Sequence, residues 1–146
     1  MEEKEKDGII MDPEEKGDIG EKYITKQLIE LGWKVFFPED KYSISDRILM
    51  KGDKIYLAQF KFKEIRFIRP DTGFAKYQYE NYKRDQEIHK LKLLVLFTDN
   101  SGEIYGEWLD NLHNCEPEEV LNKKDKQLMI CWLKSKLKDY KELLRC

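Results

Sequence analysis

A hairpin pattern around Gly52-Asp53 restricts the fold of this 146-residue chain more than any other feature. Gly-Asp suits a two-residue hairpin turn, and residues 46–50 and 54–63 on either side of it have the composition of strands. The register matters, because a slip of one residue moves every side chain to the other face of the sheet. With this turn, three pairs should lie opposite each other: Met50 with Ile55, Ile48 with Leu57, and Asp46 with Gln59.

The second strand of this hairpin is predicted to have two unlike faces. One face is apolar throughout and consists of Tyr56, Ala58, Phe60 and Phe62. The other face begins with Ile55 and Leu57 and ends with Gln59, Lys61 and Lys63. We therefore expect a buried apolar face and, at one end of the opposite face, a polar group made of Asp46, Gln59 and Lys61.

Helix and strand signals on both sides of the hairpin complete a mixed pattern. Asp12-Pro13 predicts the start of a helix that runs to about Leu31, where Gly32 stops it. The other expected elements are a strand over 33–37, a loop over 64–75, a helix over about 75–91, strands over 93–98 and 103–108, and a helix over 135–144. Residues 128–133 fit either a strand or the start of a helix. Residues 1–11 are expected to be flexible, and the order α-β-β-β-α-β predicts one α/β (α+β) domain over residues 12–146.

The composition excludes several classes of protein and of metal site. The longest apolar runs are too short to span a bilayer, and the charged start does not resemble a secretory signal, so we expect a cytoplasmic protein without a membrane partner. Three cysteines without a paired spacing predict free thiols rather than a zinc or iron–sulfur site. With only two histidines, any metal is expected to be a hard ion held by oxygen atoms.

Positive charge is concentrated in residues 61–92, although the whole chain carries a formal net charge of −2. This stretch has nine basic and five acidic residues and also contains six aromatic residues. Interleaved basic and aromatic side chains suit a phosphate backbone and unstacked bases. A lysine-rich, solvated surface over an aromatic core would give the same composition.

Two helices carry further candidate residues. Glu21 lies at the edge of the apolar stripe of the first helix. A carboxylate at such a position is expected to have a functional role or to form an ion pair, for example with Lys61. Gln78 and Tyr82 lie four residues apart and share a face of the helix over 75–91, which Asp85 and His89 continue. Taken singly, each of these features also fits an ordinary structural role.

Together these motifs resemble the PD-(D/E)XK nuclease superfamily, in particular its Holliday-junction-resolvase-like and RecB-like members. The matching positions are Glu21 in the first helix, Asp46 at the start of the hairpin and Gln59-Phe60-Lys61 on its second strand. Gln78 and Tyr82 resemble the Q-x-x-x-Y helix motif of RecB-like nucleases. The resemblance covers roughly residues 14–98 and implies a restriction-endonuclease-like core, with a central mixed β-sheet flanked by helices.

The resemblance also implies a metal-dependent nuclease site that binds Mg²⁺ or Mn²⁺. Its ligands would be Asp46, Gln59, the backbone carbonyl of Phe60 and Glu21, and Glu80 is a further candidate ligand. Lys61 would orient the attacking water or stabilise the charge that develops in the reaction. Gln59 departs from the family pattern, because an amide stands where the family has an acid, and this predicts weaker metal binding. The implied DNA contacts are Lys63, Arg66, Arg69, Lys76, Gln78, Tyr82, Lys83 and Arg84. Members with an iron–sulfur cluster carry four cysteines, so no such cluster is expected in this chain.

Three functional hypotheses remain open from the sequence. The first is an active DNA nuclease of repair, recombination, restriction or mobile-element and viral DNA processing, acting on duplex, branched or single-stranded DNA. The second is a nucleic-acid-binding domain of the same fold that has lost metal affinity through Gln59. The third is an interaction module in which Asp46, Lys61 and Glu21 form a structural ion-pair network. A homodimer would suit the cleavage of two strands, although no residue specifies its interface.

Overall fold

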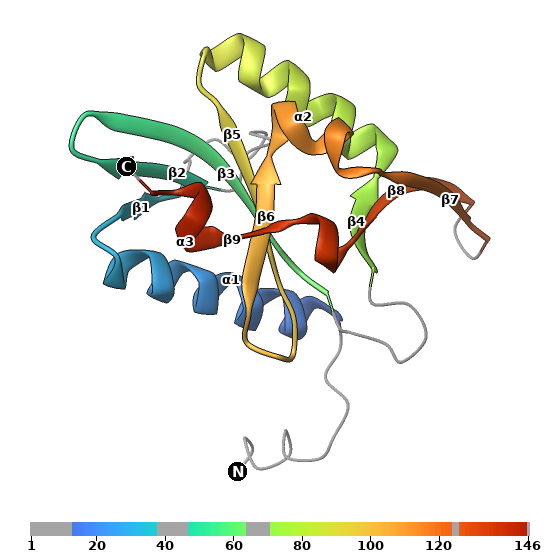
Figure 1. Ribbon diagram of the computed structural model, residues 1–146, viewed down its shortest axis with the longest axis horizontal. Coiled ribbons are helices and arrows are strands. Elements are labelled where there is room, and N and C mark those ends of the chain that lie inside the picture. Colours follow the sequence, from blue (N-terminus) through green and yellow to red (C-terminus); the bar gives the residue numbers. More distant parts are fainter. Residues whose placement is uncertain (1–12, 38–46, 64–70, 124–125, 146) are drawn as a thin grey trace.

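The computed structural model describes residues 13–37, 47–63, 71–123 and 126–145. A six-stranded sheet forms its centre (Figure 1), in the order β1-β2-β3-β5-β6-β9. The strands are β1 (Lys34–Phe36), β2 (Arg47–Lys51), β3 (Lys54–Phe62), β5 (Leu93–Thr98), β6 (Ile104–Trp108) and β9 (Lys138–Asp139). Among the described strands of this sheet, β3 and β5 pair in parallel and the other neighbours are antiparallel. The expected α+β class with a central mixed sheet is therefore confirmed.

Helices cover both faces of this sheet (Figure 1). The helix α1 (Pro13–Glu30) packs on one face, and the short helix α3 (Tyr140–Leu143) joins the same hydrophobic cluster. The helix α2 (Lys76–His89) and the 3-10 helix η2 (Leu109–Cys115) cover the other face. The predicted helices around α1 and α2 are thus confirmed, with α1 ending two residues before Gly32.

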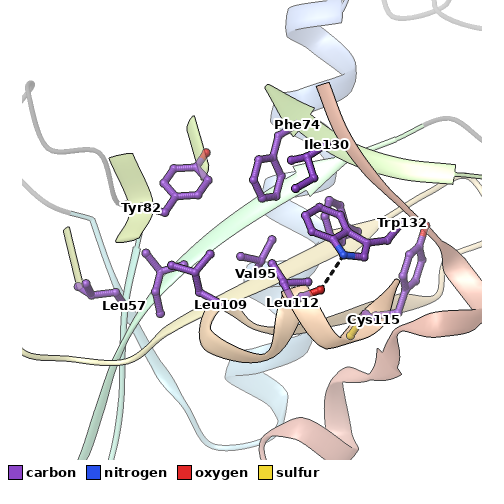
Figure 2. Packing of buried hydrophobic residues seen from close by; sticks show 12 residues of the cluster. Leu57, Phe74, Tyr82, Val95, Leu109, Leu112, Cys115, Ile130 and Trp132 are labelled. Atoms are coloured by element: carbon purple, nitrogen blue, oxygen red, sulfur yellow. Dashed lines mark hydrogen bonds between the residues drawn. The ribbon is translucent and has the colours of Figure 1, made fainter. Parts of the chain in front are cut away.

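The strand β5 separates two hydrophobic cores, because all six of its side chains are buried. Leu93, Val95 and Phe97 join the cluster on the α2 side, which Figure 2 shows together with the indole of Trp132. Leu94 and Leu96 join the cluster on the α1 side. A strand that is buried on both faces has a continuous apolar sequence, and residues 93–97 have one.

The hairpin has the predicted register. Lys51 lies opposite Lys54, Met50 opposite Ile55, and Ile48 opposite Leu57, up to the pair Arg47–Ala58. Gly52 takes the positive φ of +63° that a two-residue turn of this kind requires. Asp46 lies outside the described residues, so its predicted position opposite Gln59 stays a prediction.

The structure contains a second sheet that the sequence did not predict. Its strands come from residues 71–75 and from the C-terminal third of the chain. It has the order β4-β8-β7 and consists of β4 (Asp71–Ala75), β7 (Glu118–Asn122) and β8 (Gln127–Leu133). The predicted loop is therefore wrong for 71–75, and 128–133 is a strand. The predicted helix over 135–144 is also wrong, because only Tyr140–Leu143 is α-helical, after a 3-10 turn η3 (Lys134–Lys136) and β9. Residues 71–75 form a strand because they pair with β8, and the sequence of this segment alone does not reveal the pairing.

No helix in the described ranges is long and apolar enough to cross a membrane.

Gly106 provides a test of the packing between β5 and β6. A Cβ atom at this position would lie 1.9 Å from the carbonyl oxygen of Val95, which is backbone and cannot move aside. We expect Gly106→Ala to lower the free energy of unfolding by about 3 kcal/mol, as measured by urea denaturation. A matched control is Gly52→Asn in the turn. A Cβ atom added at Gly52 would have no other part of the chain within 4 Å, and Asn tolerates the positive φ of this position. A loss as small as that of the control would contradict this strand pairing.

Candidate active site

Gln59 and Lys61 extend from β3 toward the face that α2 covers. They alternate along the strand with Ala58 and Phe60, which belong to the α1-side core, and they follow Leu57, which belongs to the α2-side core. The parallel pairing sets Gln59 beside Val95 and Lys61 beside Phe97. The side chain of Gln59 is buried, with 2 % of its surface exposed, whereas Lys61 is partly exposed. The prediction that these two polar residues share one face is confirmed.

Two aromatic rings, Phe74 and Tyr82, hold the ammonium group of Lys61, and we call this pair the aromatic seat. The Nζ atom lies 5.6 Å from the ring centroid of Phe74 and 5.5 Å from that of Tyr82. Both rings are 2 % exposed, and their centroids lie 5.3 Å apart in an edge-to-face arrangement. Figure 2 shows both rings within the cluster on this face. A cation over two buried ring faces is stabilised by about 0.5–2 kcal/mol, which favours one position of the ammonium group.

Glu21 meets a different basic residue on the α1 side of the sheet. The Nη2 atom of Arg47 donates to Oε1 of Glu21 at 3.1 Å. Arg47 lies opposite Ala58 and close to the ring of Phe60, so its side chain belongs to the α1 face. The structure thus gives Glu21 an ionic partner on the face opposite to the aromatic seat.

The described part of the chain supplies few charged ligands for a metal ion. Within it, no group of three His, Cys, Asp or Glu side chains could hold a metal. Gln59 and the carbonyl of Phe60 are oxygen donors of the type that Mg²⁺ accepts, but they are neutral. The donor set therefore fits a hard divalent cation only if Asp46, which lies outside the described residues, adds a carboxylate.

The two residues of the Q-x-x-x-Y motif have structural partners. Oε1 of Gln78 accepts a hydrogen bond from the backbone N–H of Ala75 at 3.2 Å, which caps the start of α2. Tyr82 is part of the aromatic seat, and Asp85, on the same helix face, is buried and pairs with His89. The predicted common face of these residues is confirmed.

Within the described ranges, the other predicted DNA-contacting and metal-binding residues lie on the surface, most of them beside groups of opposite charge. Lys76 pairs with Glu119 at 2.9 Å, and Lys83 lies 3.9 Å from Glu80. The Nη1 atom of Arg84 donates to Oδ1 of Asn81, and Lys63 is exposed just after β3. Arg66 and Arg69 lie outside the described residues. DNA contacts by these residues, and metal binding by Glu80, stay predictions.

A polar cluster around Asp99 lies at the same edge of the sheet, and sequence reasoning missed it. Asp99 follows β5, and its carboxylate accepts hydrogen bonds from the backbone N–H of Ser101 at 2.8 Å and from the hydroxyl of Tyr105 at 2.8 Å. The hydroxyl of Ser101 also donates to it. Lys134, which follows β8, lies 3.1 Å from the carboxylate and also pairs with Glu103. The cluster therefore ties the second sheet to the end of the central one.

The cluster changes the titration of its members. Burial alone would raise the pKa of Asp99, but the hydrogen bonds from Ser101, Tyr105 and Lys134 outweigh it and hold the pKa below the ordinary value of 3.8. Burial and the neighbouring carboxylate of Asp99 raise the pKa of Tyr105, so this residue remains a hydrogen-bond donor.

Comparison with known proteins shows similarity in fold. No protein-family model and no curated protein matches the sequence. Among solved structures, Hjc, a Holliday junction resolvase from the archaeal hyperthermophile Archaeoglobus fulgidus, has a TM-score of 0.63 at 10 % identity, over 87 % of this chain and 93 % of that one. D212, a nuclease from a fusselovirus, has a TM-score of 0.52 at 12 % identity, over 92 % of this chain and 91 % of that one. The chain therefore has the fold of these two proteins, and the fold implied by the PD-(D/E)XK resemblance is confirmed.

The lowered pKa of Asp99 predicts how its contribution to stability depends on pH. Because folding favours the charged form, the contribution is complete above pH 3.8 and is lost as the pH falls through the folded-state pKa. We expect Asp99→Asn to lower the free energy of unfolding by about 3 kcal/mol at pH 7, and by clearly less at pH 3. Urea denaturation at both pH values measures this difference. The exposed carboxylate of Glu87 provides the control Glu87→Gln, and an equal loss from Asp99→Asn at both pH values would contradict the assignment.

Proposed function

We propose that this protein is a metal-dependent nuclease that hydrolyses phosphodiester bonds in DNA, in repair, recombination, restriction or the processing of mobile-element or viral DNA. The observation that carries the proposal is the position of Lys61, whose ammonium group lies over the rings of Phe74 and Tyr82 on the face that also holds Gln59. The shared fold with a resolvase and a viral nuclease supports it.

The position of Lys61 suits a reaction in which negative charge develops. An ammonium group fixed before the substrate arrives stabilises a transition-state charge without the cost of reorganising around it. Lys61 would orient the attacking water or stabilise the charge on the phosphate. Phe74 and Tyr82, which are both buried, would position Lys61. The DNA contacts predicted for Tyr82 and Gln78 stay predictions.

Asp46 and Gln59, with the carbonyl of Phe60, would hold Mg²⁺ or Mn²⁺ beside Lys61. When bound, the ion would neutralise the scissile phosphate and lower the pKa of a water molecule. Glu21 is not included in this set, because it pairs with Arg47 on the opposite face of the sheet. Glu80 is the candidate for an additional carboxylate. The exposed basic side chains of Lys63, Lys76, Lys83 and Arg84, together with Arg66 and Arg69, would contact phosphates and fix the position of the DNA without reading its sequence.

A DNA-binding domain with weakened metal affinity is the second candidate function. The neutral and buried side chain of Gln59 favours it, because an amide contributes no charge at a position where the family has an acid. Salt-dependent DNA binding without cleavage would distinguish this function from that of a nuclease.

The catalytic role of Lys61 predicts a loss of cleavage without a loss of binding. We expect Lys61→Ala to lower the cleavage rate at least about 100-fold, because it removes a charge that acts on the transition state, and to change DNA affinity by less than about three-fold. The measurement is a cleavage assay with Mg²⁺, Mn²⁺ or EDTA on labelled single-stranded, duplex, flap and four-way-junction DNA, beside a binding assay in EDTA.

Lys54→Ala provides the matched control, because it removes the same group from the opposite end of β3. Wild-type cleavage by Lys61→Ala would overturn the role of this residue. Cleavage in EDTA, or equal cleavage by an Asp46→Ala variant, would overturn the metal dependence. The absence of both cleavage and DNA binding in the wild type would favour an interaction module.

Metal binding at Gln59 can be tested through the melting temperature of a variant, without an activity assay. Gln59→Glu places a carboxylate at a position that is 2 % exposed, so the variant should have a lower melting temperature in EDTA. Mg²⁺ should then raise the melting temperature of the variant more than that of the wild type, because the ion binds only the folded site. The control Gln127→Glu adds the same charge on β8, away from the site. Equal Mg²⁺ effects on all three proteins would contradict metal binding at Gln59.

A further inference from the structure

A cavity of about 510 Å³ opens beside α1, on the face of the sheet opposite to the aromatic seat. Its lining includes Lys22, Lys26, Ile29 and Glu30 from α1, Phe37 after β1, and Arg47 at the start of β2. The cavity has the size of a site for a small organic group, for which about 300–1,000 Å³ is typical. None of the lysines or aromatic residues that line it has a role in the proposed catalysis.

The ring of Phe37 is exposed and supported from one side. Its exposed fraction is 61 %, and the guanidinium carbon of Arg47 lies 4.1 Å from its centroid. Arg47 is itself fixed, because its side chain is 11 % exposed and donates to Glu21 at 3.1 Å. A ring held in this way presents a flat apolar surface at little entropic cost, which is the form of a stacking platform for a base.

Positive charge borders this platform. Lys22 and Lys26 are one helical turn apart on α1, and both are exposed. Ile29, which is 55 % exposed, adds apolar surface to the lining of the same cavity. Glu30 is the acidic residue among those that line the cavity, and its carboxylate can accept a hydrogen bond from an exocyclic amino group.

We propose that this cavity binds one unpaired nucleotide of the DNA substrate, with the base stacked on Phe37 and the adjacent phosphates beside Lys22 and Lys26. An aromatic platform with nearby cations is complementary to this ligand, because every base has a π face and every linkage a negative charge. The inference rests on the proposed DNA nuclease function and narrows its substrate. DNA with unpaired nucleotides, as in a flap or a single strand, would bind better than blunt duplex.

The test is the affinity for DNA in EDTA, where no cleavage takes place. Fluorescence anisotropy with a labelled oligothymidylate and with a blunt duplex measures it. Phe37→Ala should weaken single-strand binding about ten-fold or more, and duplex binding by less than about two-fold. Phe37→Trp should restore the single-strand affinity, and its added fluorescence should be quenched when the oligonucleotide binds. The matched control is Phe36→Ala, which removes a neighbouring exposed ring that does not line the cavity.

The outcomes separate this inference from the proposed function. Cleavage by the wild type, with unchanged single-strand affinity in Phe37→Ala, would overturn the nucleotide site alone. A selective loss of single-strand affinity in Phe37→Ala supports the site even if the wild type does not cleave. Equal losses in Phe36→Ala and Phe37→Ala, no quenching in Phe37→Trp, or a change of Phe37→Ala only in the oligomeric state would each overturn it.

Discussion

The parallel pairing of β3 with β5 is the constraint on which the rest of the structure depends. It places a fully buried strand beside a strand whose two faces differ, so that one side of the sheet packs against α1 and the other against α2. Because the carboxyl ends of parallel strands lie at the same edge, Lys61 on β3 and Asp99 after β5 come to the same edge of the sheet. The proposed active site and the polar cluster that braces it are both consequences of this pairing.

The second sheet completes the site that the central sheet begins. β4 brings Phe74 over Lys61, and β8 leads to Lys134, which pairs with Asp99. The indole N–H of Trp132 on β8 donates to the carbonyl of Leu112 at 2.9 Å (Figure 2), which fixes the sheet against η2. The aromatic seat is therefore held by contacts between segments far apart in the chain, which suits the preorganised position proposed for Lys61.

The sequence predicted the features that neighbouring residues determine. It did not predict the contacts between segments that lie far apart in the chain. The hairpin register followed from the turn at Gly52-Asp53 and from alternation, so the shared face of Gln59 and Lys61 could be derived. Phe74 could not be recognised as a partner of Lys61, because β4 becomes a strand only by pairing with β8, more than 50 residues later. The ionic partner of Glu21 could not be predicted either, because it depends on how α1 packs on the face of the sheet that carries Arg47.

The proposed function depends on a metal ion held by Gln59 and Asp46 beside Lys61, on the α2 face of β3. The most direct measurement is anomalous diffraction from crystals of the wild-type protein soaked in Mn²⁺. We expect an anomalous peak at direct-ligand distance from Oε1 of Gln59 and from the carboxylate of Asp46, on the same face as the Lys61 ammonium group. Mn²⁺ bound only to exposed surface carboxylates, with none at Gln59, would contradict this metal site.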